Sequence, residues 1–170
     1  CGIDELDFDQ ANNYSAVRVF KASLVYFTAN QSDFLDATTG AEITVPVGDN
    51  AGFLFFINNP SLRSNLEKLE IEVEIINQFN REFKGKIQFF NENGGLTHEF
   101  DDLYIASKQT NYKNTFTLLI ADNVSFLNST EVRLQVELQP STDGSVLNPA
   151  NQETLNFKST GVYYIKGGTK

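Results

Sequence analysis

The chain has few of the residues from which most catalytic and metal sites are built. Its 170 residues include one cysteine and one histidine and no tryptophan. A single cysteine cannot form an internal disulfide, and a single histidine removes the His-pair zinc sites. The Gly-x-Ser-x-Gly elbow, the His-Glu-x-x-His motif and a phosphate-binding glycine loop are also missing. We therefore expect neither an enzyme nor a resident cofactor.

Basic residues and long apolar runs are scarce as well. Thirteen Lys and Arg stand against 22 Asp and Glu, which gives a net charge of -9 and a pI near 4.5. This balance opposes contact with phosphate backbones or anionic headgroups, because both require an excess of cations, so nucleic acid is not an expected partner. The longest apolar runs, residues 53–57 and 116–121, are far shorter than the roughly 18 residues of a spanning helix.

What the sequence does contain is the pattern of an all-β domain. Hydrophobic residues make up 41% of the chain and include 15 Phe, enough for one buried core. Short runs rich in Val, Ile, Phe, Tyr and Thr alternate with Asn, Gly, Asp and Ser clusters. We predict a single antiparallel β-sandwich over residues 16–170, immunoglobulin-like or Greek-key, with 8–10 strands. The expected strands are 17–28, with a break near Ala22, and 42–47, 51–58, 66–77, 83–90, 96–100, 103–106, 114–120, 131–138, 154–158 and 162–165.

The clearest strands alternate apolar and charged residues with a period of two. Residues 69–75 carry Glu at every second position, and residues 83–89 carry Lys at two of theirs. One face of each strand should be buried and the other wet. The opposite charges predict a hairpin in which Glu74 lies opposite Lys84 and Glu72 opposite Lys86. This gives the Glu stripe a structural explanation in preference to a functional acidic patch.

Turn signals predict how later strands connect. Residues 91–95 should turn the chain into a third strand from Leu96. The corner at residues 121–126 loosely resembles the entry to the sixth strand of immunoglobulin-like sandwiches. Because the usual Tyr, the paired Cys and the core Trp are missing, only the architecture carries over. Residues 139–152 form a long loop, a candidate contact surface before an expected last hairpin.

The start of the chain, Cys1-Gly2-Ile3, resembles the mature start of bacterial lipoproteins. The resemblance implies that Cys1 carries a diacylglycerol and an N-acyl chain, which anchor the protein without a spanning segment. A fragment boundary that happens to fall on Cys is the alternative. If Cys1 is acylated, we expect residues 1–15 to be an extended tether between the lipid and the folded domain.

The tether is acidic at Asp4, Glu5, Asp7 and Asp9. An acidic cluster after the Cys is similar to the signal that sends lipoproteins of the Bacteroidota to the outer face of the outer membrane. A solvated linker explains the same charges equally well. The resemblance implies a lipid-anchored, surface-facing location.

Consecutive Phe pairs point one ring to each face of a strand, so one member faces outward unless something covers it. Phe56 and Phe90 are therefore candidate contacts with a protein partner, and Tyr163 in the last strand is a third. His98 lies near three carboxylates, but His98 and Glu99 are adjacent on a strand and point to opposite faces, which disfavours a metal or acid/base site there.

Three functions follow in order of preference. The first is an accessory or scaffolding lipoprotein of an outer-membrane complex serving surface export, nutrient uptake or barrel assembly, which binds its partners through sandwich edges and loops. The second is a cell-surface glycan-binding or adhesive module, although the missing Trp removes the usual stacking residue. The third, a glycosidase, needs two convergent carboxylates, and nothing in the pattern assembles them.

Overall fold

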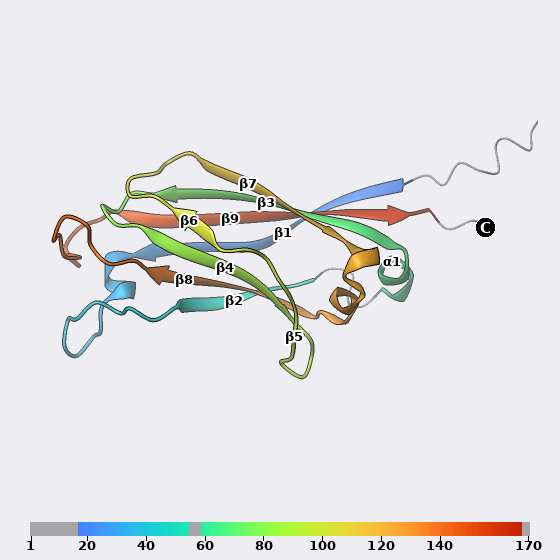
Figure 1. The fold of residues 1–170 in the computed structure, drawn as a ribbon, viewed down its shortest axis with the longest axis horizontal. Coiled ribbons are helices and arrows are strands. Elements are labelled where there is room, and N and C mark those ends of the chain that lie inside the picture. Colours follow the sequence, from blue (N-terminus) through green and yellow to red (C-terminus); the bar gives the residue numbers. More distant parts are fainter. Residues whose placement is uncertain (1–16, 55–58, 168–170) are drawn as a thin grey trace, which may run out of the picture.

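The computed structural model describes residues 17–54 and 59–167 as two antiparallel sheets packed face to face (Figure 1). The expected lipidation site Cys1, the acidic residues of the tether and Phe56 lie outside the described residues. Their roles stay predictions.

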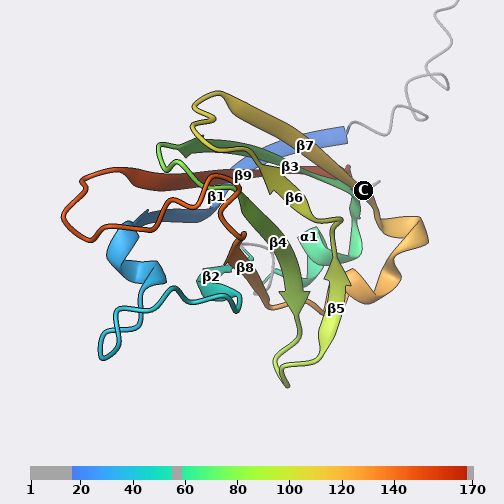
Figure 2. The same cartoon turned by 60° about the vertical axis from the view of Figure 1, so that its left-hand side comes forward.

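The first sheet has four strands, in the order β1-β9-β3-β7. The second has five, in the order β2-β8-β4-β5, with β6 also paired to β4. Figure 2 shows β5 and β6 following one another along the same side of β4. In chain order the strands are β1 (Val17–Asn30), β2 (Val47–Phe53), β3 (Leu66–Asn77), β4 (Phe83–Phe90), β5 (Leu96–Glu99), β6 (Leu103–Ile105), β7 (Tyr112–Leu119), β8 (Glu131–Leu138) and β9 (Thr154–Lys166).

Helical segments are short and lie between strands. They are η2 (Gln31–Phe34), α1 (Pro60–Ser64), η3 (Ile120–Asp122) and η4 (Val124–Asn128). The α1 helix begins with the side chain of Asn59 accepting a hydrogen bond from the Leu62 amide at 3.1 Å, and Pro60 follows at its first position.

The strand order is that of a jelly roll. If β5 and β6 are taken as one interrupted strand, eight strands form two sheets in which the first lies beside the last. The predicted all-β sandwich of 8–10 strands is confirmed. Of the two topologies left open, the order selects the Greek-key one, because β1 pairs with β9 and not with β2.

The core lies between the sheets and is rich in phenylalanine. The rings of Phe34, Phe79 and Phe83 meet at one end, with the Phe34 and Phe83 centroids 5.0 Å apart. Phe89 packs edge-on against Phe126 at 5.0 Å toward the other. In β3, β4 and β8 every second residue is buried over most of the strand, as the alternating pattern predicts.

The predicted hairpin between β3 and β4 is wrong. β3 pairs with β7 and β9, whereas β4 belongs to the other sheet and pairs with β8, β5 and β6. The connection crosses the sandwich because it carries Phe79, which is fully buried and could not sit in an exposed tight turn. Asn77 holds this corner by accepting from the Phe79 amide at 3.0 Å and donating to the Arg81 carbonyl at 2.8 Å.

The charges of the two strands are matched by other neighbours. Glu74 pairs with Lys113 of β7 at 3.5 Å, and Glu72 with Lys21 of β1 at 3.3 Å. Lys84 lies opposite Glu137 of β8. The structural explanation of the Glu stripe holds, with different partners.

The expected last hairpin is also wrong, because residues 154–166 form one strand, β9. Ser159, read as part of a turn, is buried, and its hydroxyl exchanges hydrogen bonds with the amide and carbonyl of Val25 at 3.1 and 3.2 Å. These bonds fall at the bulge in β1 between Ser23 and Tyr26. Gly161 leaves room for the ring of Tyr163, because a Cβ added to Gly161 would lie only 2.8 Å from the nearest ring carbon.

Of two smaller expectations, one is confirmed and the other is wrong. The turn at residues 91–95 does join β4 to β5, with Gly94 at φ +76° and Asn91 accepting from the Gly95 amide at 2.8 Å. Residues 42–46 of the expected strand 42–47 instead form a loop with one bridge, between Leu35 and Glu42, and Val47 begins β2. Glu42 is drawn toward Arg81, as described below.

Candidate interaction surfaces

The two described candidate contacts differ in their surroundings. Phe90 is half-buried on the outer face of β4, and the Arg133 guanidinium lies 4.3 Å from its ring centroid. Phe89 beside it is fully buried, so the Phe pair does point one ring to each face. Tyr163 is not a surface residue: it has 0% exposure, and burial raises the pKa of its phenol. The prediction that Tyr163 faces outward in β9 is wrong, and it is the next residue, Tyr164, whose side chain faces outward.

His98 is a packing residue. Its ring lies edge-on to Phe100 at 4.8 Å and 6.3 Å from Phe89. Burial lowers the pKa of His98, with nearby Glu99 acting weakly in the opposite direction. Glu99 points to the other face, where it accepts from Gln88 at 3.0 Å. The described residues hold no group of three or more His, Cys, Asp and Glu placed to bind a metal ion.

The edge of β1 is the most apolar exposed strand surface. β1 pairs with β9 on one side, and no described strand pairs with the other. Val17 and Val19 are 48% and 52% exposed, and both lie on the outer face of the sheet. Exposed edge strands with apolar side chains are sites where another strand can add.

Val19 belongs to a row that runs across the whole sheet. Register places it beside Tyr164, then Lys68, then the exposed Leu119. Lys68 lies 3.9 Å from the Tyr164 ring centroid and 2.7 Å from Glu70, which also accepts from the Tyr164 hydroxyl at 2.8 Å. The hydrogen bond from Lys68 lowers the pKa of Glu70, and the same bond raises the pKa of Lys68. The row is an amphipathic band bordered by aliphatic side chains.

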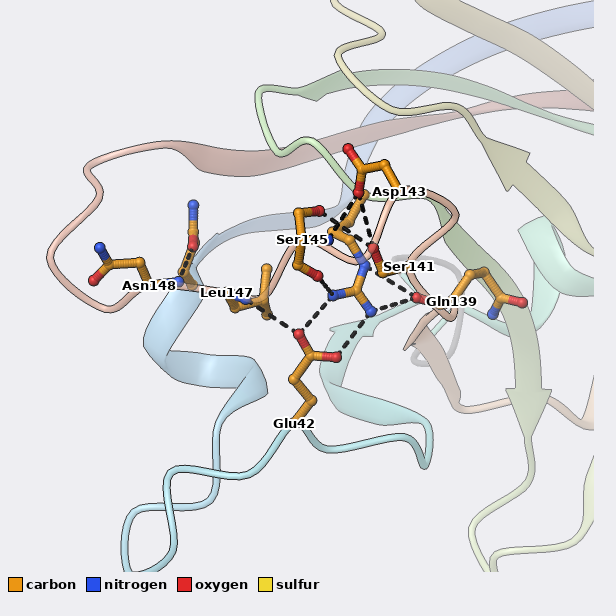
Figure 3. A network of polar contacts seen from close by, with 9 residues as sticks. Glu42, Gln139, Ser141, Asp143, Ser145, Leu147 and Asn148 are labelled. Carbon is orange, nitrogen blue, oxygen red and sulfur yellow. Dashed lines mark hydrogen bonds and ion pairs between the residues drawn. The ribbon is translucent and has the colours of Figure 1, made fainter.

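At the opposite end, long loops are clamped by one buried arginine (Figure 3). Arg81 is 5% exposed, and each of its two terminal nitrogens donates a hydrogen bond to the Glu42 carboxylate, at 2.5 and 2.9 Å. It also donates to the carbonyls of Gln139 at 2.7 Å and Ser145 at 3.4 Å. Glu42 in turn accepts from the Leu147 amide at 3.1 Å. The hydrogen bond from Arg81 lowers the pKa of Glu42.

The predicted contact loop at residues 139–152 is therefore ordered by several ties. Asp143 accepts from the Ser145 amide, Ser141 and Asn80, all at 2.9 Å. Hydrogen bonding from Ser145, through its side chain and its amide, lowers the pKa of Asp143 most, and Ser141 and Asn80 lower it further. Gln31 accepts from the Asn148 amide at 2.6 Å. Sequence reasoning did not single out Arg81 or Glu42. The available signal was a five-residue connection containing an arginine and a phenylalanine but no glycine.

A polar groove lies on the outer face of the five-stranded sheet. It has a volume of about 180 Å³ and is lined by Pro46, Lys84, Lys86, Gln88, Gln135 and Glu137. Lys84 and Lys86 each lie near Asp102, at 3.6 and 3.5 Å. Tyr104, 70% exposed, is the register neighbour of Lys84 on the side away from Glu137.

No helix within the described residues has both the length and the apolarity to cross a membrane.

No protein-family model and no curated protein matches the chain. Among solved structures it is similar to infectious bursal disease virus, Gx strain, with a TM-score of 0.53 and 14% identity over 91% of this chain and 34% of that one. It is also similar to a protein from Parabacteroides distasonis ATCC 8503 whose secretion is inferred, with a TM-score of 0.51 and 14% identity over 91% and 38%. The chain spans about a third of the length of these two, and the likeness is one of fold.

Proposed function

We propose that this protein is a non-enzymatic accessory or scaffolding lipoprotein of an outer-membrane protein complex, anchored to the cell surface through an acylated Cys1. The observation that carries the proposal is the edge of β1, where Val17 and Val19 are exposed beside an edge that no described strand covers. A partner strand could add here and cover the aliphatic side chains. The clamped loops at the other end offer a second, ordered contact surface.

The anchor is supported by the position of the single cysteine and by the acidic residues that follow it. A structural neighbour from a Bacteroidota species is described as a protein with inferred secretion, which agrees with an exported protein. Two acyl chains would hold the sandwich stably at the bilayer.

The anchor is tested by metabolic labelling with a palmitate analogue. We expect the wild type to be labelled and membrane-bound, and Cys1→Ala to be unlabelled and released as a folded protein. Because the sequence has no other cysteine, Cys1→Ala leaves no alternative thiol to acylate. An unlabelled wild type, or a Cys1→Ala variant that stays in the membrane, would contradict the anchor.

The partner surface is tested by comparing Val17→Glu/Val19→Glu with Val124→Glu. Val124 is 63% exposed and lies in η4, which belongs to neither of the two proposed contact surfaces, so it is the control. With an epitope inserted between Thr38 and Thr39, the same outer-membrane proteins should co-purify with wild type and control, and at least about tenfold less with the double variant. Such a loss corresponds to roughly 1.4 kcal/mol of binding free energy. Equal recovery, or no companion protein in mild detergent, would contradict the scaffolding role.

A further inference from the structure

The outer face of the five-stranded sheet carries a polar groove lined by both donors and acceptors. Contacts within the protein leave part of their hydrogen-bonding capacity free. We propose that this groove binds a neutral saccharide, with Tyr104 as its stacking surface. The inference goes beyond the scaffolding role and does not depend on it, because the β1 edge belongs to the other sheet.

The two lysines of the groove keep free hydrogen-bonding capacity. The Lys84 ammonium lies 3.6 Å from Asp102 and 4.0 Å from Glu137. The Lys86 ammonium lies 3.5 Å from Asp102 and 3.8 Å from Glu99. All four distances exceed the 2.7–3.2 Å typical of hydrogen bonds, so the contacts are charge pairs. Each ammonium can still donate to a ligand oxygen in the groove.

Neighbouring side chains supply both donors and acceptors. The Gln135 amide, half-buried beside Lys86, makes no hydrogen bond to any residue the structure describes. An amide provides two N–H donors and a carbonyl acceptor. Glu137 provides carboxylate oxygens within the groove, whereas Asp102 lies beyond the lysines, outside the groove lining, with its Oδ1 buried. A ligand here would meet donors and acceptors from β4 and β8.

The charges of the groove select the ligand class. Lys84 and Lys86 stand among Asp102, Glu99 and Glu137, two cations among three carboxylates. An anionic ligand would face the carboxylates, and a metal ion would face the ammonium groups. An apolar ligand would bury charged groups without hydrogen bonds, which is unfavourable. Hydroxyl groups both donate and accept, so a neutral polyhydroxyl ligand fits the set.

Tyr104 supplies the apolar element that such a ligand also needs. Its side chain is 70% exposed on the same face, next to Lys84 in register. An exposed ring offers a flat apolar face against which the C–H face of a sugar ring can pack. Tyr26, 75% exposed on the other sheet, lines a smaller cavity of about 100 Å³ whose other lining residues are apolar, with none of the lysine, amide or carboxylate groups of the groove, and gives a control.

The test is native affinity electrophoresis of the full chain, purified in mild detergent, through gels containing dextran, mannan or xylan, with anionic alginate as a fourth gel. We expect at least one of the three neutral polysaccharides to retard the wild type. Tyr104→Ala and Gln135→Ala should weaken the affinity roughly fivefold to tenfold, whereas Tyr26→Ala should behave as wild type. Circular dichroism checks that each variant is folded.

Three results would overturn the inference. They are no retardation by any of the neutral polysaccharides, retardation by alginate alone, and retardation that survives Tyr104→Ala and Gln135→Ala unchanged. Because this assay uses no membrane partner, its outcome is independent of the co-purification test of the scaffolding role.

Discussion

Arg81 is the residue on which the loop end of the sandwich depends. Its guanidinium is buried and meets Glu42 through two hydrogen bonds, while backbone carbonyls take its other donors. Removing one partner of a buried ion pair leaves the other charge uncompensated, which costs far more than the pair contributes by forming. The consequence is that Glu42, although partly exposed, should tolerate substitution poorly.

We predict that Glu42→Ala lowers the free energy of unfolding by about 3 kcal/mol. The reason is the stranded Arg81 guanidinium, together with the loss of the acceptor for Leu147. Urea denaturation measures the change, and Glu67→Ala, at an exposed carboxylate, is the control and should stay within about 0.5 kcal/mol of wild type. A loss below about 1 kcal/mol in Glu42→Ala would mean that the clamp is not a stabilising element.

His98 makes stability depend on pH above the carboxylate range. Burial against Phe89 and Phe100 lowers its pKa below the ordinary 6.5, so the unfolded chain binds a proton more readily than the folded one. The free energy of unfolding should therefore decrease as pH falls below about 6.5, until the folded-state pKa is passed. The midpoint temperature of thermal unfolding should be lower at pH 5.5 than at pH 7.5 for the wild type, and this decrease should be absent in His98→Gln. Identical pH profiles for both proteins would contradict this.

At the scale of the element, β9 is a central strand that pairs along its length with a neighbour on each side. It lies between β1 and β3 and passes Gly161 under the ring of the buried Tyr163. We predict that Gly161→Ala costs about 1–3 kcal/mol, because the ring has no room to give way. Thr160→Ala, one residue earlier on the outer face, should cost less than about 1 kcal/mol. Equal chemical denaturation midpoints for these two variants would contradict the close approach.

Single elements were also what the sequence predicted best. The bounds of β3, β4 and β8 match the expectation, because period-two alternation marks both the strand and its buried face. Pairing was not predictable in the same way, since Glu74 is equally compatible with Lys84 and with Lys113. Only the burial of Phe79 separates a hairpin from a crossing between sheets.

The candidate surfaces were harder to predict than the strands. Tyr163 and Tyr164 are adjacent, and the sequence does not show which of them faces outward. Tyr163 faces the core because it lies on the same face of β9 as the buried Ser159 and Gly161. The exposure of Val19 follows from the place of β1 at a sheet edge, which is a property of the strand order. The groove beside Lys84 likewise combines residues from β4 and β8 with Pro46, which precedes β2.

At the scale of the whole molecule, the two sheets share one core and should unfold together. Phe89 of β4 is fully buried, and Phe89→Ala should cost about 3–5 kcal/mol. We expect amide hydrogen exchange in β3 and β9, which lie in the other sheet, to accelerate as much as in β4 and β8. Val146→Ala, in an exposed loop, is the control. Protection in β9 that is unchanged by Phe89→Ala would show that the sheets open separately.

The pairing of β1 with β9 also decides how the protein can be engineered. Val17 and Lys166 are register partners, so the outer ends of these two strands lie side by side (Figure 1). A fluorescent protein or affinity handle fused after β9 would emerge beside Val17 and Val19 and crowd that edge. The same adjacency allows circular permutation: a short linker from Lys166 back to Val17, with new ends opened at the exposed turn around Gly94, should preserve every strand pair except that of β4 with β5.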